Sequence, residues 1–335
     1  MKLTIEQIRT ITTGAVRIIE EPDGIHFCRF TAEQEEMYRL RRQDFYEYTF
    51  STPGIRLRFR TDSNRLALNF LTENAGPRTF FSVDISVNGE FFDCVDNCRK
   101  IAPAEMYGSV DYPLGRFSGS WELPEGEKEI CIYLPWSVKF VLQELQLQDG
   151  ASLIPVQPAK KALCFGDSIT HGADAIHPCR RYISRLCDYL GVQEYSKAIC
   201  GEMFWPELAA AKDDFLPEYI AVAYGTNDWS HDEFPEVEAH CRGFFNNLIR
   251  TYPEAKIIAI TPLWRKDEKE KSRKVPLCAV HELICDAVKD YPNATVICGD
   301  DLVPHDPAYF GDLRLHPNDK GFDCYYENLV KALSR

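Results

Sequence analysis

Four short blocks in the second half of the chain contain the residue types best suited to chemistry. They read Gly-Asp-Ser-Ile-Thr at 166–170, a lone Gly201, Gly-Thr-Asn-Asp at 225–228, and Leu-His-Pro-Asn-Asp-Lys-Gly-Phe at 315–322. A serine hydroxyl is a weak nucleophile at neutral pH and needs a neighbouring base to accept its proton. Ser168 next to glycine, together with a histidine brought to it by the fold, would be able to attack a carbonyl group.

Each block by itself has a structural alternative. Asp167 and Ser168 could cap the amino end of a helix, because both side chains accept hydrogen bonds from unpaired backbone amides there. Asn227 could be a turn residue, and His316 could cap the last helix. Three other histidines, at 171, 177 and 231, lie close in sequence to the blocks and compete with His316 as the base.

The elements that would position these blocks are visible in the hydrophobic pattern from residue 161 onward. Short apolar runs alternate with segments of helical period, which is typical of a parallel sheet covered by helices on both faces. The runs lie at 162–165, 219–224, 257–260 and 295–298, and the helical segments at 180–190, 237–250, 280–289 and 322–333. A further strand is expected to end at 198–200. Ligands bind at the carboxyl ends of such strands, and the blocks follow the apolar runs.

Residues 1–150 have a different pattern, with alternating polar and apolar residues and almost no helical period. Strands are expected at 55–59, 66–70, 81–87, 129–134 and 139–146. Asn88-Gly89 predicts a tight hairpin turn, because both residues tolerate positive φ. This half is therefore predicted to be an antiparallel β-sandwich. Residues 151–160, with two prolines, are predicted to be the linker to a catalytic domain at 161–335.

With the blocks in this order, residues 160–335 resemble the SGNH (GDSL-like) hydrolase superfamily. The resemblance implies a flavodoxin-like three-layer α/β/α domain that needs no cofactor. It also implies that Ser168 is the nucleophile of an esterase and His316 its general base. The oxyanion-hole donors would be the Ser168 and Gly201 N–H groups and the Asn227 side-chain amide. Asp167 and Asp228 would organise loops.

The third member of the catalytic triad departs from the family pattern. The superfamily usually places an aspartate three residues before the histidine, and Leu313 stands there in this chain. Asp312, four residues before, either reaches the imidazole or leaves that task to a backbone carbonyl. We expect Asp312 to orient His316.

A β-sandwich in front of such a domain resembles carbohydrate esterase family 2, whose sandwich is jelly-roll-like and which deacetylates xylan- and mannan-type sugars. This resemblance implies an acetylated oligosaccharide or small ester as substrate. Trp229 and Trp205 are candidate sugar-stacking residues, although tryptophans more often pack in cores. The alternatives are a general short-chain esterase, a lysophospholipase or thioesterase, and, more remotely, a catalytically silent carbohydrate-binding protein.

The amino-acid composition narrows the range of possible binding partners. The formal net charge is −13, with 51 acidic and 38 basic side chains, and such a surface repels nucleic acid and anionic membranes. The 13 cysteines are scattered, so we interpret them as reduced thiols of a cytoplasmic protein. Cys94 and Cys98 lack a second pair at zinc-ligand spacing, and no metal site is expected. The charged run 265–274 is expected to be a solvated loop or helix start. The sequence contains no signal for the oligomeric state.

Overall fold

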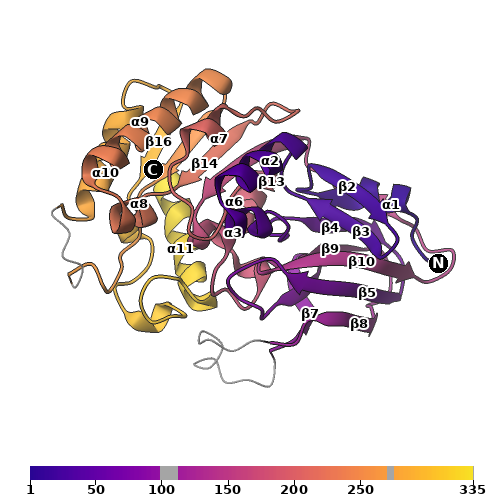
Figure 1. Cartoon of the computed structure of the whole chain (residues 1–335). Coiled ribbons are helices and arrows are strands. Elements are labelled where there is room, and N and C mark those ends of the chain that lie inside the picture. Colours follow the sequence, from indigo (N-terminus) through magenta and orange to yellow (C-terminus); the bar gives the residue numbers. More distant parts are fainter. Residues whose placement is uncertain (99–111, 270–274, 335) are drawn as a thin grey trace. The chain divides into compact units, whose positions relative to one another are not determined.

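A computed structural model of the chain describes residues 1–98, 112–269 and 275–334 (Figure 1). The chain divides into two compact units. The first contains Met1–Ala159 together with two short segments from the second half, Ile176–Cys179 and Gln193–Ser196. The second contains Lys160–Ala175, Arg180–Val192 and Lys197–Arg335. Across the described ranges, no helix combines the length and apolar character needed to cross a bilayer.

The first unit is built on two antiparallel sheets. One sheet has the order β1-β4-β9-β6-β7, with β11 beside β4, and the other has the order β2-β3-β10-β5-β8. In the first sheet the strands are β1 (Thr12–Thr13), β4 (Arg56–Thr61), β6 (Ser82–Val87), β7 (Glu90–Asp96), β9 (Lys128–Tyr133) and β11 (Ile154–Pro155). In the second they are β2 (Arg17–Glu21), β3 (Gly24–Cys28), β5 (Arg65–Asn74), β8 (Gly115–Glu122) and β10 (Val138–Leu147).

One hydrophobic cluster joins the two sheets, as expected of a sandwich. In β5, Leu66, Leu68 and Phe70 are buried while the residues between them are not, which is the period-two pattern of a strand with one face in the core. The predicted hairpin is confirmed: Asn88 and Gly89 have φ of 54° and 85°, and β6 pairs with β7 across them. The predicted linker includes β11, whose Ile154 pairs with Arg60 of β4.

In the described part of the first unit, three helices were not predicted from the sequence. They are α1 (Ile5–Ile11), α2 (Ala32–Arg41) and α3 (Gln43–Tyr48). Both α1 and α2 begin with a capping box, in which a threonine and a glutamine three residues later bond to each other's backbone amides.

A parallel sheet has the order β13-β12-β14-β15-β16, and all of its strands lie in the second unit except β13, whose residues 193–196 are grouped with the first. Its strands are β12 (Lys160–Gly166), β13 (Val192–Ser196), β14 (Tyr219–Ala223), β15 (Lys256–Ile260) and β16 (Ala294–Ile297). In chain order this sequence of strands is 2-1-3-4-5, the flavodoxin-like arrangement, which confirms the predicted fold class. β13 ends at Ser196, earlier than the predicted end at 198–200.

The helices of this unit form two groups by their contacts. α6 (Tyr182–Tyr189) contacts α11 (Asp319–Leu333), whereas α7 (Pro206–Ala210) and α10 (Cys278–Val288) both contact α9 (Phe234–Thr251). Right-handed crossovers put these groups on opposite faces of the sheet, which gives three layers. Two short helices, α5 (Ser168–His171) and α8 (Thr226–His231), begin directly after β12 and β14.

Candidate active site

Three of the four polar blocks follow three adjacent strands of the parallel sheet. β12 is the central strand of the three, with β13 on one side and β14 on the other. Ser168 follows β12, Gly201 follows β13, and Asn227 follows β14. Parallel strands all end at one edge of their sheet, so the topology gathers these residues there.

The fourth block supplies a histidine that reaches the serine. Ser168 Oγ lies 2.8 Å from Nε2 of His316, and Nδ1 of His316 lies 2.9 Å from Oδ2 of Asp312. With Nδ1 donating to the carboxylate, Nε2 carries the lone pair that can accept the serine proton. The serine is 6% exposed, and the histidine side chain is 16% exposed, so the pair is largely shielded from water.

Asp312 is held as an anion by its own loop. Its Oδ1 accepts hydrogen bonds from the backbone N–H groups of Arg314, Leu315 and His316 at 2.9, 2.7 and 3.1 Å. Burial raises the pKa of Asp312, but the hydrogen bond and charge of His316 and these amides outweigh it and hold the pKa well below its ordinary value. Leu313 has φ of 56°, a left-handed backbone conformation, within this tight turn. The aspartate four residues before His316 is thereby brought to the imidazole.

A second carboxylate lies near the same imidazole nitrogen. Oδ2 of Asp174 is 3.8 Å from Nδ1 of His316, too far for a hydrogen bond but close enough for a strong electrostatic effect. Asp174 is fully buried and has φ of 68°. Sequence reasoning missed this residue, because nothing in the spacing connects 174 with 316.

The predicted oxyanion-hole residues are linked by hydrogen bonds between their loops. Gly201, with φ of 83°, is the third residue of a turn closed by a bond from Glu202 N–H to the Ile199 carbonyl. Only glycine adopts this conformation easily. Asn227 Nδ2 donates to the Glu202 carbonyl at 3.0 Å, and Phe204 N–H donates to Oδ1 of Asp228 at 2.9 Å. The amide of Asn227 has two N–H groups, so one is left to meet a substrate oxygen.

The backbone N–H of Ser168, the third predicted donor, lies at a helix start. Ser168 is the first residue of α5, where N–H groups have no acceptor within the helix. Asp167 caps this helix through a 2.9 Å bond from Ile169 N–H to its side chain. The capping alternative and the nucleophile prediction therefore apply to two different residues of the same block.

The residues of this site lie within a stretch of the chain that matches a known protein family. The model of the GDSL-like Lipase/Acylhydrolase family matches residues 164–324, a stretch that contains all four blocks. Residues 164–324 belong to this family.

Solved structures resemble the chain over nearly its whole length. A salicylyl-acyltransferase, SsfX3, from a tetracycline biosynthetic pathway is 20% identical, with a TM-score of 0.77, covering 96% of this chain and 93% of its own. A putative GDSL-like lipase from Bacteroides ovatus is 19% identical, with a TM-score of 0.76 and coverages of 100% and 97%. An acetyl xylan esterase from Butyrivibrio proteoclasticus is 13% identical, with a TM-score of 0.63 and coverages of 99% and 97%. At these identities the likeness shows the shared two-part fold. No curated protein sequence matches the chain.

The two aspartates of the family blocks, Asp167 and Asp228, are buried. Burial raises the pKa of Asp167 to about 6 and that of Asp228 to about 7. Both side chains accept backbone N–H groups, which partly opposes the shift. They organise the loops next to Ser168 and Asn227, as the resemblance implies.

An ionic network ties the Asn227 loop to the His316 loop. Arg265 donates to the carbonyl and hydroxyl oxygens of Thr226 at 3.1 and 3.0 Å, and to both carboxylate oxygens of Asp267 at 2.6 and 3.0 Å. Arg314 donates to the same carboxylate at 2.9 Å. Although burial acts to raise it, the pKa of Asp267 is lowered to about 2 by these two arginines.

The prediction of a solvated loop at 265–274 is wrong at its start, because Arg265 is 2% exposed. Residues 270–274 of that run lie outside the described residues. A run of alternating charges gave no indication that two of its members pair inside the protein.

The two candidate sugar-stacking tryptophans differ in placement. Trp229 is 3% exposed, its Nε1 donates to the Val275 carbonyl at 2.8 Å, and the Arg265 guanidinium lies over its ring at 5.3 Å. This placement does not fit a sugar platform, because the ring faces are covered by protein. Trp205 is half-buried at the amino end of α7 and stays a candidate.

The competing histidines have other hydrogen-bond partners. Nδ1 of His171 lies 3.0 Å from the Ala198 carbonyl, and Nδ1 of His231 lies 2.9 Å from the Asn227 carbonyl. His177 lies in the segment assigned to the first unit and pairs with Asp84. His316 is the histidine that reaches Ser168.

Proposed function

We propose that this protein is a serine esterase that hydrolyses short-chain acyl esters, with acetylated oligosaccharides of the xylan or mannan type as its substrates. The chain of contacts from Ser168 Oγ through both nitrogens of His316 to Asp312, at 2.8 and 2.9 Å, is the observation that supports it most directly. The match of residues 164–324 to a GDSL-like acylhydrolase family supports hydrolysis of an acyl group.

The proposed mechanism follows from the positions of the protons on Ser168 and His316. His316 Nε2 takes the Ser168 hydroxyl proton while Oγ attacks the ester carbonyl carbon, and the same proton then passes to the departing sugar oxygen. Water next gives a proton to Nε2 and attacks the acyl carbon, and that proton then passes from Nε2 to Ser168 Oγ as acetate is released. Asp312 stays ionised throughout and stabilises the imidazolium formed in each half-reaction.

Negative charge develops on the carbonyl oxygen in both tetrahedral intermediates. The proposed donors are the backbone N–H groups of Ser168 and Gly201 and the Asn227 amide. Neutral donors fixed in place before the reaction stabilise that charge without reorganising, and loss of one costs about 10²–10³ in rate. The bond from Asn227 to Glu202 keeps its amide from rotating.

The nucleophile is tested with Ser168→Ala and with a fluorophosphonate ester that labels active serines. We expect a loss of at least about 10³-fold in kcat with the fold retained. Intact-mass spectrometry should show one adduct, absent from the variant. Ser334→Ala, an exposed serine at the carboxyl end of α11, is the matched control. A Ser168→Ala protein that keeps activity or label would overturn the assignment.

The substrate class is tested with p-nitrophenyl esters of increasing length and with acetylated xylo- and manno-oligosaccharides. A methyl-sized acyl pocket predicts that kcat/KM falls from acetyl to butyryl and nearly vanishes at octanoyl. A lysophospholipase- or thioesterase-type pocket predicts the reverse, because each buried methylene contributes about 0.8 kcal/mol. Better turnover of octanoyl esters would remove the carbohydrate substrate while leaving the serine mechanism in place.

Acyl transfer is the second candidate, favoured by the likeness to a salicylyl-acyltransferase. The acyl-enzyme can pass its acyl group to an alcohol in place of water. Partition of the acetyl group between water and added xylobiose or glycerol, measured by product analysis, distinguishes the two. Transfer that dominates at millimolar acceptor would identify a transferase. We also expect turnover to be unaffected by chelators, and full inhibition reversed by a divalent ion would contradict the proposed mechanism.

A further inference from the structure

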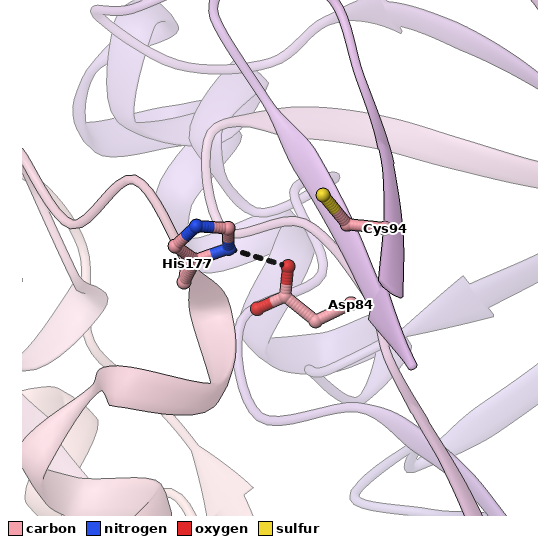
Figure 2. Close-up of side chains that lie close together, drawn as sticks. All are labelled: Asp84, Cys94 and His177. Atoms are coloured by element: carbon pink, nitrogen blue, oxygen red, sulfur yellow. Dashed lines mark hydrogen bonds and ion pairs between the residues drawn. The ribbon is translucent and has the colours of Figure 1, made fainter. Parts of the chain in front are cut away.

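Three side chains of the first unit converge at the sheet that contains β6 and β7 (Figure 2). Asp84 of β6 and Cys94 of β7 are direct cross-strand partners, so their side chains project from the same face. His177 comes from the segment Ile176–Cys179, which belongs to the same compact unit. One ligand-type atom of each residue, a carboxylate oxygen, Sγ and a ring nitrogen, lies within 4.8 Å of the other two.

The donor set suits a divalent ion of the zinc type. Zinc binds thiolate sulfur, imidazole nitrogen and carboxylate oxygen in four-coordinate sites. A thiolate, a carboxylate and a neutral imidazole carry a combined charge of −2, which one divalent cation neutralises. Asp84 is 0% and Cys94 7% exposed, so both ligand groups are shielded from bulk water. The His177 side chain is 30% exposed and leaves a path for the ion.

Neighbouring groups already orient two of the three ligands. Ser82 Oγ donates to Oδ1 of Asp84 at 2.6 Å, and Cys179 N–H donates to Oδ2 at 3.1 Å. The His177 ring packs edge-on against Phe91, with ring centroids 5.0 Å apart. Outer partners of this kind fix the direction of metal ligands and raise affinity.

We propose that Asp84, Cys94 and His177 form a zinc site, with water as the fourth ligand. His177 Nδ1 and Asp84 Oδ1 are now 2.9 Å apart and share a proton. The ion replaces that proton at Nδ1, and the proton moves through solvent to Nε2 of His177. The Cys94 thiol, now 3.5 Å from Oδ2 of Asp96, loses its proton to solvent. Ligand atoms in a tetrahedral site are about 3.4 Å apart, so the side chains need shifts of roughly 1 Å.

Without a metal, the same contacts would be a hydrogen-bonded pair with a thiol beside it. Two further clusters compete for an added ion: Glu21, Asp23 and His26 in the first unit, and Asp174, Asp312 and His316 at the candidate active site. Neither contains sulfur. A readout that reports the thiolate therefore separates the proposed site from both.

The experiment titrates the chelator-treated full-length protein with cobalt(II), followed by absorption, and with zinc(II), followed by calorimetry and thermal unfolding. We expect one tight zinc equivalent, release of about one proton, a melting temperature raised by several degrees, and a thiolate-to-cobalt charge-transfer band. Cys94→Ser should abolish the band. It and His177→Gln should each weaken zinc binding by more than the roughly 10- to 100-fold typical of removing an outer partner such as Ser82.

Cys98→Ser is the matched control, because this buried cysteine lies four residues away and contacts the Phe81 carbonyl. It should bind cobalt and zinc like the parent protein. Circular dichroism of the metal-free variants checks that each is folded. Absence of the charge-transfer band in the parent, or a band that survives Cys94→Ser in the folded protein, overturns the proposal. Zinc binding with no band and with loss of esterase turnover would assign the ion to the His316 cluster.

Discussion

Asp174 places a fully buried carboxylate 3.8 Å from Nδ1 of His316, the same ring nitrogen that lies 2.9 Å from Asp312. Nδ1 of His316 therefore faces two carboxyl groups. A charge at this distance inside a protein contributes strongly even without a hydrogen bond. The two aspartates act on one titrating ring and are not independent.

Asp312→Asn should consequently lose less activity than removal of the nucleophile. We expect kcat to fall about 10²-fold, because Asp174 still stabilises the imidazolium, whereas loss of a sole triad carboxylate costs about 10⁴. Asp174→Asn alone should cost about 3- to 10-fold. The double variant should lose about 10⁴-fold, the loss typical of a triad left without a carboxylate and more than the product of the two single losses. Steady-state kinetics of the four proteins form the cycle, and strictly multiplicative losses would contradict the sharing of His316.

The left-handed backbone of Leu313 predicts that glycine is tolerated at this position better than a β-branched residue. Its side chain is 58% exposed and φ is 56°, a conformation that costs a non-glycine residue about 1–2 kcal/mol. Leu313→Gly should keep the kcat of the parent, and its free energy of unfolding should lie within about 1 kcal/mol of the parent value. Leu313→Val should lose roughly 1–3 kcal/mol and lower kcat, because β-branched residues resist positive φ. Equal behaviour of the two variants in denaturant unfolding and kinetics would show that the turn does not hold Asp312.

Asp267 joins Arg265 and Arg314, so its removal should affect both loops of the site. Asp267→Asn leaves the buried Arg265 without its anionic partner, and we expect a loss of about 3 kcal/mol in the free energy of unfolding. Asp267 has its pKa lowered to about 2. Its contribution is therefore complete above about pH 4 and is lost as the pH falls toward 2. Urea unfolding of both proteins against pH should show the difference shrink on acidification, and a constant difference would exclude this ionic origin.

For Asp228 we predict the opposite dependence of the free energy of unfolding on pH. Burial raises its pKa from 3.8 to about 7, so between these values the native state keeps a proton that the unfolded chain has released. The free energy of unfolding then falls as the pH rises through this window. Asp228→Asn keeps the acceptor for Phe204 N–H and carries no charge. It should exceed the parent by on the order of 1–3 kcal/mol above about pH 7 and match it near pH 4. A variant less stable than the parent at both pH values would show that the carboxylate is needed as an anion.

The layout of both units could be predicted because local patterns determine it. The alternation in β5 and the Asn88-Gly89 turn depend only on neighbouring residues, and the apolar runs of β12 and β14 need no knowledge of their partners. The helix α2 was missed although its capping box, Thr31 with Gln34, is visible in the sequence. Its charged surface hides the apolar stripe on which helix prediction relies.

The parts of the site that could not be predicted depend on contacts between distant residues. Asp174 and Arg265 have no motif of their own, and their roles follow from where the chain returns 142 and 39 residues away, at His316 and Thr226. Trp229 follows a catalytic block, yet it is buried beneath Arg265. Adjacency in sequence to a motif does not show on which side of the sheet a ring will lie.

The segments Ile176–Cys179 and Gln193–Ser196, which come late in the chain but belong to the first unit, affect how the gene could be divided. Within that unit the buried Glu194 lies 3.6 Å from Arg56, and any Cβ added at Gly14 or Gly54 would collide with it. A gene cut at codon 160 would deprive the encoded sandwich of these contributors. We therefore expect the two halves to be inherited and expressed together, and not to be exchanged separately by recombination.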